Sequence, residues 1–226
     1  MKAQDVQYIE EPPWSRALFA SVKVAWIWLI LRLWLGWEWL QAGWGKVFGG
    51  NITWKFWDWG SEEYALTGSA NVGWIVSGTR TLSDGTVVQV GVGDNVAGFA
   101  AGAIGASEGP HPDVAYGWYV SFLQWVEDTG HVVIGPLVAI GELVIGILLI
   151  IGLFTGIAAF LGATLNFSFV FAGSAGVNPL MILVSGLLIL AWRVAGWYGL
   201  DRYVLPKLGV PWQPGELFER SRTTSV

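Results

Sequence analysis

The chain has 226 residues, of which 54% are hydrophobic and 13% are charged. A soluble domain is about one quarter charged, so this composition favours an integral membrane protein. The net charge of −5, with no basic patch among the aromatic residues, argues against a nucleic-acid partner. The length allows one membrane domain and one sizeable insertion.

Four apolar runs follow one another, each long enough to cross a bilayer as a helix, which takes about 20 residues. They cover Ala17–Leu40, Val133–Leu153, Gly156–Ala172 and Leu180–Leu200. The few residues between the second and third runs predict a tight antiparallel helical hairpin. Pro179 marks the start of the fourth, because proline suits the first helical turn. We therefore predict an all-α integral membrane fold, a four-helix transmembrane bundle.

Residues 49–131 form the predicted insertion between the first two membrane helices. Asn71–Val92 alternates apolar and polar residues around a Ser-Asp-Gly turn, which predicts a β-hairpin. Asp94–Ala106 predicts a short helix capped by its aspartate. Pro112–Thr129 predicts an amphipathic helix that ends near a glycine and carries one aromatic face, made of Trp118, Phe122 and Trp125. We expect these elements to lie on the outer membrane surface as a lid over the bundle; the alternative is an irregular loop.

Basic residues set the expected orientation, because they accumulate on the cytoplasmic side. Seven flank the bundle at its ends, against three near or in the insertion. The seven are Lys2, Arg16, Lys23, Arg202, Lys207, Arg220 and Arg222, and the three are Lys46, Lys55 and Arg80. We expect both termini in the cytoplasm of a prokaryote, in a multi-pass protein of the cell membrane without a cleavable signal peptide. The predicted regions are a cytoplasmic segment 1–16, a first transmembrane helix 17–48, an extracytoplasmic insertion 49–131, helices two to four in 132–200 and a cytoplasmic tail 201–226.

Cysteine is absent, and the two histidines, His111 and His131, lie away from the membrane centre. Thiol chemistry, cysteine-bound iron–sulfur clusters and covalent haem are therefore excluded, and we expect no haem and no metal. Any redox cofactor would be diffusible, bound non-covalently or held by a partner chain.

Tryptophans gather at and beyond the outer end of the first apolar run. They are Trp34, Trp37, Trp39, Trp44, Trp54, Trp57 and Trp59. Membrane anchoring at the interface explains most of them. The alternative is a stacking platform for a flat aromatic ligand such as a quinone head.

Ionisable residues within or near the runs suggest a buried polar site, because a charge in a membrane span is costly unless it faces protein or water. Glu142, Asn166 and Arg193 each share a helical face with small residues, which mark close helix contacts. Arg32 shares a face with Gly36, Trp39, Gly43 and Lys46, and Glu38 points about a third of a turn away. We expect Glu142 to pair with Arg32 or Arg193, with Asn166 as a bridge.

Two interpretations of this polar interior stay open. The polar groups either form interhelical ion pairs that fix packing, or carry protons to a bound quinone through Glu142. In the second interpretation the catalytic candidates are Glu142, Arg32 and Glu38. The candidates for quinone binding are Arg32, Trp39, Gly43, Trp44, Lys46, Asn166 and Arg193.

Three segments resemble the DoxX/DoxD family of four-helix membrane proteins. They are LRLWLGWEWLQAGWGKV (Leu31–Val47), GELVIGILLIIGLFTGIAA (Gly141–Ala159) and AWRVAGWYGLDRYVLP (Ala191–Pro206). The resemblance implies association with redox enzymes, because DoxD-type members form the membrane part of thiosulfate:quinone oxidoreductases. The resemblance also implies that six residues of this chain stand at characteristic positions of the family: Arg32, Gly36, Gly43, Lys46, Glu142 and Asp201.

The sequence thus predicts a membrane subunit of a quinone-linked oxidoreductase of sulfur or thiol metabolism, with other protein subunits as partners. The alternative is a non-catalytic accessory subunit of a larger respiratory or photosynthetic complex. A small-solute or anion transporter is disfavoured, because the chain shows neither an inverted repeat nor interrupted helices.

Overall fold

The computed structural model describes residues 12–49, 71–82, 84–108, 114 and 116–210. Several residues used above lie outside this part of the chain: Lys2, Trp54, Lys55, Trp57, Trp59, Ser83, His111, Pro112, Arg220 and Arg222. The described structure is mostly helical. It is α1 (Pro13–Phe19), η1 (Val22–Val24), α2 (Ala25–Phe48), β1 (Gly78–Thr81), β2 (Val87–Val90), α3 (Asp94–Gly105), α4 (Gly117–Trp125), η2 (Val126–Gly130), α5 (His131–Ile151), α6 (Thr155–Phe171), α7 (Asn178–Leu190), α8 (Trp192–Ala195), α9 (Asp201–Val204) and η3 (Leu205–Leu208).

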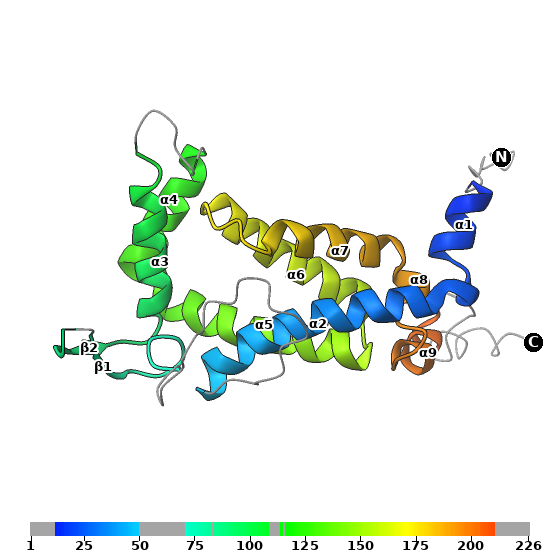
Figure 1. Ribbon diagram of the computed structural model, residues 1–226, viewed down its shortest axis with the longest axis horizontal. Coiled ribbons are helices and arrows are strands. Elements are labelled where there is room, and N and C mark those ends of the chain that lie inside the picture. Colours follow the sequence, from blue (N-terminus) through cyan, green and yellow to red (C-terminus); the bar gives the residue numbers. More distant parts are fainter. Residues whose placement is uncertain (1–11, 50–70, 83, 109–113, 115, 211–226) are drawn as a thin grey trace, which may run out of the picture.

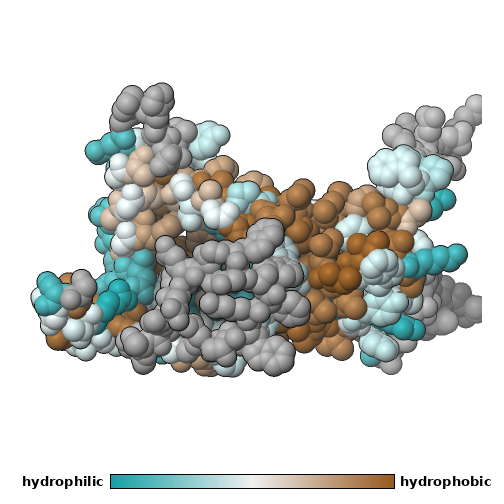
Figure 2. All heavy atoms as spheres, viewed as in Figure 1, coloured by the Kyte–Doolittle hydropathy of each residue, from teal (hydrophilic) through white to brown (hydrophobic). Residues whose placement is uncertain are grey.

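Four helices, α2, α5, α6 and α7, run along the long axis of the molecule (Figure 1). α3, α4 and the β-hairpin lie at one end of this bundle, and α1 and α9 lie at the other. The interior has a large apolar core, with Trp28 and Leu35 of α2 packed among Leu149 of α5, Ala159 of α6 and Leu188 of α7. The exposed residues on the outward faces of the same helices are largely apolar as well. Figure 2 shows this apolar surface on the side of α6 and α7. A helix that is hydrophobic all round is typical of a membrane span.

One helical run, Gly117–Ile151, is long and apolar enough to cross a membrane. The pair Pro13–Phe19 and Val22–Phe48, bent by 52°, gives a second if it forms one span. α6 and α7 are shorter apolar helices. The predicted fourth run is interrupted: α7 ends at Leu190, and α8 begins at Trp192. The expectation of uninterrupted helices was therefore wrong for this run.

Glycines let α2 and α5 pack closely and fix their antiparallel register. A Cβ built on Gly36 would lie 2.9 Å from Leu149 Cβ, and one on Gly146 would lie 2.7 Å from Leu40 Cα. At Gly43 a Cβ would overlap the backbone of Leu143. The predicted use of small residues at helix contacts is confirmed at these positions.

Replacing Gly43 with alanine should lower the free energy of unfolding by about 1–3 kcal/mol, because the two backbones must separate. Gly186→Ala on α7 is the matched control, since its Cβ would have no atom within 4 Å. Thermal unfolding in detergent micelles, followed by circular dichroism, measures both. Equal midpoints for the two variants would contradict the close approach of α2 and α5.

The β-hairpin and α3 were correctly predicted. Gly78 pairs with Val90 and Thr81 with Val87, and the turn between them includes Asp84. The Thr86 N–H donates to Asp84 Oδ1 at 2.9 Å, and this hydrogen bond lowers the pKa of the Asp84 carboxyl. The predicted cap of α3 differs in detail. Gly93 is the cap residue, and the carboxylate of the next residue accepts a hydrogen bond from Gly91 N at 2.6 Å.

The predicted amphipathic helix does not end near Gly130. α4 passes through the π-helical turn η2 directly into α5, so that residues 117–151 form one helical run. The run bends at this turn (Figure 1), and the bent position of α4 is held in part by Tyr119 Oη, which donates to the Ser168 carbonyl of α6 at 2.5 Å. A straight helix would instead carry Tyr119 about 18 Å beyond the start of α5.

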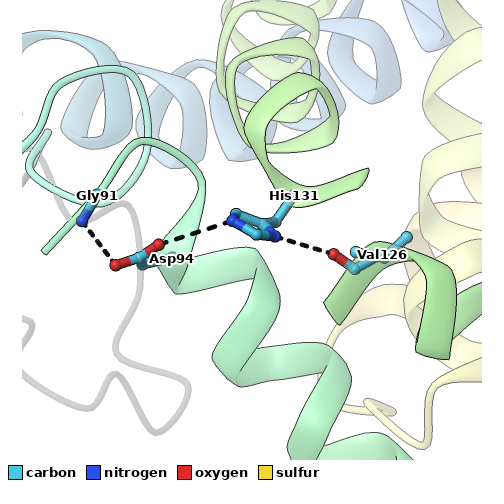
Figure 3. Close-up of polar contacts among 4 residues, drawn as sticks. All are labelled: Gly91, Asp94, Val126 and His131. Atoms are coloured by element: carbon cyan, nitrogen blue, oxygen red, sulfur yellow. Dashed lines mark hydrogen bonds and ion pairs between the residues drawn. The ribbon is translucent and has the colours of Figure 1, made fainter. Parts of the chain in front are cut away.

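Polar contacts at the bend connect it to α3 (Figure 3). Nδ1 of His131 lies 3.2 Å from the Val126 carbonyl oxygen, within the π-helical turn. Nε2 of the same ring lies 3.9 Å from Oδ1 of Asp94 at the start of α3. The His131 ring therefore lies between the π-helical turn and the start of α3, at hydrogen-bond distance from the turn only.

Candidate functional site

A buried ion pair lies between α2 and α5. Lys46 Nζ contacts Glu142 Oε2, and Glu142 is only 1% exposed. The contact follows from the helix register, since Gly43 brings α2 against the backbone at Leu143. Side chains on a helix point toward its N-terminus, so Lys46 reaches back from the end of α2 to the level of Gly43.

The predicted partner of Glu142 was therefore wrong. Arg32 lies too far along α2, because its guanidinium packs against Gly152 and Gly199 beyond the end of α5. From Glu142 to Gly152 the helix rises by about 15 Å. Arg193 is exposed on the short helix α8, where its guanidinium lies 5.9 Å from the ring centroid of Trp192.

Trp74 covers the ion pair from the insertion. Its ring centroid lies 4.8 Å from Lys46 Nζ, a cation–π distance. Its carbonyl oxygen would lie 3.2 Å from a Cβ at Gly135, so this turn packs closely on α5. The sequence analysis missed Trp74, because nothing in the short turn between Asn71 and Val76 shows which helix it touches. The lysine side chain remains 21% exposed.

Two further polar side chains approach the same layer of the bundle. Trp39 Nε1 would lie 2.8 Å from a Cβ at Gly162, and Ile145 of α5 also contacts this glycine position, at 3.5 Å. Glu142 lies one turn from Ile145, and Asn166 lies one turn from Gly162 on the antiparallel helix α6. Trp39, from α2, therefore lies within about one helical turn of the level that Glu142 and Asn166 share.

Trp39 and Asn166 have buried polar atoms without a hydrogen-bond partner in the described structure. Asn166 is fully buried, and neither its Nδ2 nor its Oδ1 has a hydrogen-bond partner within the described residues. The same holds for Trp39 Nε1. Buried polar groups are nearly always hydrogen-bonded in folded proteins, and each exception calls for a bound molecule or another explanation. We call Trp39, Lys46, Glu142 and Asn166 the central cluster.

A second buried charged site lies at the opposite end of α5. Arg32 Nη2 donates to the Tyr198 carbonyl oxygen at 3.1 Å, and both Arg32 and Asp201 are 1% exposed. The Asp201 carboxylate accepts hydrogen bonds from Phe154 N at 2.6 Å and from Thr155 N at 3.0 Å. It thereby caps the N-terminus of α6, where no side chain of the helix itself does so. The carboxylate thus has a structural role, while Arg32 Nε and Nη1 and Thr155 Oγ1 lack hydrogen-bond partners within the described residues.

The remaining predicted site residues lie outside the central cluster. Glu38 is half-buried on another face of α2. Trp44 is exposed and packs against Phe48 with ring centroids 4.5 Å apart. Gly43 contributes its close backbone contact but no functional group. Within the described ranges, no three acidic, histidine or cysteine side chains gather closely enough to hold a metal ion.

Comparison with known proteins gives one match. Residues 117–214 match the family model described as TQO small subunit DoxD. The matched segment begins at α4 and includes Glu142, Asn166 and Asp201, but it omits α2 with Trp39 and Lys46. It spans less than half of the 226 residues. No curated protein and no solved structure matches the chain significantly.

Proposed function

Since residues 117–214 match the family model described as TQO small subunit DoxD, we propose that this chain is the membrane subunit of a quinone-linked oxidoreductase complex. The observation that carries the proposal is the central cluster. It combines a fully buried carboxylate and a lysine with two polar side chains that lack partners. The family description suggests thiosulfate as the reductant of the complex.

The hydrogen-bond donors of the central cluster are of the chemical kind that holds a quinone. The carbonyl oxygens of a quinone accept hydrogen bonds, and Trp39 Nε1 and Asn166 Nδ2 are buried donors that have no acceptor among the described residues. These two side chains would hold the ring, and the lysine ammonium would favour developing negative charge on an oxygen. When bound, a quinone supplies the capacity to accept two electrons and two protons.

Glu142 is the proposed proton carrier of the site. A carboxylate within a membrane bundle is costly unless it is paired, and Lys46 stabilises its charged form. The partly exposed lysine also connects this buried carboxylate to the outer surface. Electrons would come from a partner subunit, since a small subunit acts together with others.

We further propose that α2, α5, α6 and α7 with α8 make four membrane crossings. Two features support this topology. The outward faces of α5, α6 and α7 are apolar, and α1 and α9 lie at the same end of the bundle (Figure 1). With basic residues concentrated near that end, it would face the cytoplasm.

A non-catalytic accessory subunit is the second candidate, and one observation favours it. Lys46 already satisfies Glu142 in a direct ion pair, as a purely structural interface would require. In that case the complex would bind its quinone on another chain.

Mass spectrometry of quinones retained after gentle purification separates the two candidates. The unaltered protein should retain quinone, and Asn166→Leu should reduce the retained amount by up to about tenfold, the equivalent of one lost hydrogen bond. Thr164→Val is the control, because Thr164 is exposed on the same helix and its hydroxyl donates to the Phe160 carbonyl oxygen of that helix. Partner chains that co-purify without any quinone would overturn the catalytic proposal and support the accessory role.

A further inference from the structure

α4 carries an aromatic stripe that the described structure covers only in part. Trp118, Phe122 and Trp125 recur at helical spacing and are 64%, 38% and 50% exposed. Tyr116, just before the helix, is exposed as well and approaches Trp118 with ring centroids 6.4 Å apart. A contiguous apolar surface of this kind marks an interaction site.

The other two stripes of α4 show how the helix is seated. Tyr119, Leu123 and Val126 are buried and pack with Val96 and Ala100 of α3. Ser121 and Gln124 form an exposed polar stripe on the remaining side. α4 therefore has three faces: one packs on α3, one is polar and exposed, and the third is the aromatic stripe, which is apolar and largely exposed.

The aromatic stripe is continuous with the outward face of α6. Phe171 at the end of α6 contacts Trp118 and Tyr116, with ring centroids 6.2 and 5.6 Å apart. Phe167, one turn earlier, lies 6.1 Å from Phe171 and is exposed. The surface that would face lipid tails along the bundle thus runs into the aromatic stripe.

We propose that α4 is an interfacial helix that lies in the outer headgroup layer of the bilayer, with its aromatic stripe, Trp118, Phe122 and Trp125, in contact with lipid. α4 stands across the direction of the bundle (Figure 1), as a helix in the plane of the membrane would. Tryptophan and tyrosine favour this layer, because their rings are apolar and their N–H or O–H groups remain hydrated. An amphipathic helix binds there through its apolar face. The inference rests on the proposed membrane placement and is independent of quinone chemistry.

The absence of cysteine makes this surface directly measurable. Single substitutions Trp118→Cys and Phe122→Cys, and the matched pair Ser121→Cys and Gln124→Cys, each give one site for a fluorescent NBD label. The labelled full-length chains are reconstituted into vesicles of phosphatidylcholine and phosphatidylglycerol. Quenching is measured with a lipid nitroxide placed near the headgroup and with aqueous cobalt(II).

Labels at 118 and 122 should be quenched several-fold more by the lipid nitroxide than labels at 121 and 124, and cobalt(II) should show the reverse order. Equal access of cobalt(II) to all four positions would overturn the inference. Protection of 118 and 122 that develops only when partner subunits are added would overturn it too, in favour of a protein-binding surface. Trp125→Cys offers a third position on the stripe if one of the aromatic substitutions prevents folding. If the purified protein retains no quinone, the proposed function fails, but the expected labelling results stay the same.

Discussion

Glu142→Gln is expected to abolish quinone reduction while the protein stays folded. Glutamine has the same shape but cannot carry a proton, and loss of a positioned proton carrier lowers turnover by roughly 10²–10⁴-fold. The change leaves Lys46 without its charge partner. The stability cost is limited, because the lysine side chain is 21% exposed and can turn toward water. Steady-state quinone reduction by the purified complex measures the effect.

A matched exposed carboxylate provides the control for this substitution. Glu127→Gln, at the π-helical turn of the same helical run, removes a carboxylate outside the central cluster and should retain full turnover. Circular dichroism and co-purification of partner chains check that both variants assemble. Full turnover in Glu142→Gln would eliminate the proton-carrying role and leave the accessory subunit as the better account.

The second large effect concerns stability at the opposite end of the bundle. Asp201→Ala should lower the free energy of unfolding by about 3 kcal/mol, because two charge-assisted hydrogen bonds to the start of α6 are lost. It also removes the negative charge close to the buried Arg32 guanidinium, and an unbalanced buried charge is strongly destabilising. Thermal unfolding of the whole chain in detergent micelles measures the loss.

Two variants make the assignment specific. Asp201→Asn retains one acceptor oxygen and should fall between the unaltered chain and Asp201→Ala. Asp128→Ala removes an exposed aspartate near the bend and should leave the midpoint nearly unchanged. An Asp201→Ala midpoint equal to that of Asp128→Ala would show that the cap of α6 contributes little.

Local patterns predicted most of the helices and the hairpin. Alternation around the turn that contains Asp84 predicted β1 and β2, and Pro179 correctly marked the start of α7. Small residues predicted the close helix contacts at Gly43 and Gly146. These features depend on residues close together in the chain or on one helix face, which a sequence pattern can show.

Which residues surround Glu142 could not be predicted from such local patterns. Arg32 and Lys46 share one face of α2, yet 14 residues of helix separate them by about 21 Å. Which of them meets Glu142 depends on the register between α2 and α5, and this register is set by tertiary contacts at Gly36 and Gly43. The sequence therefore predicted one site where the structure has two.

The bend at Gly130 was missed for a related reason. A glycine after an amphipathic segment usually ends a helix, but here the five-residue turn η2 keeps the backbone hydrogen-bonded through the change of direction. Tertiary contacts, including the bond between Tyr119 and Ser168, hold α4 in its new direction. No pattern within the segment encodes that contact.

The continuous backbone of residues 117–151 has a mechanical consequence. Glu142 lies about three turns beyond the bend, within α5, which continues from the π-helical turn without a loop. A change in the direction of α4 must therefore be absorbed by the hydrogen bonds of η2 or passed on to the backbone that carries Glu142. The surface helix and the buried carboxylate thus belong to one continuous element, which a loop at Gly130 would have divided in two.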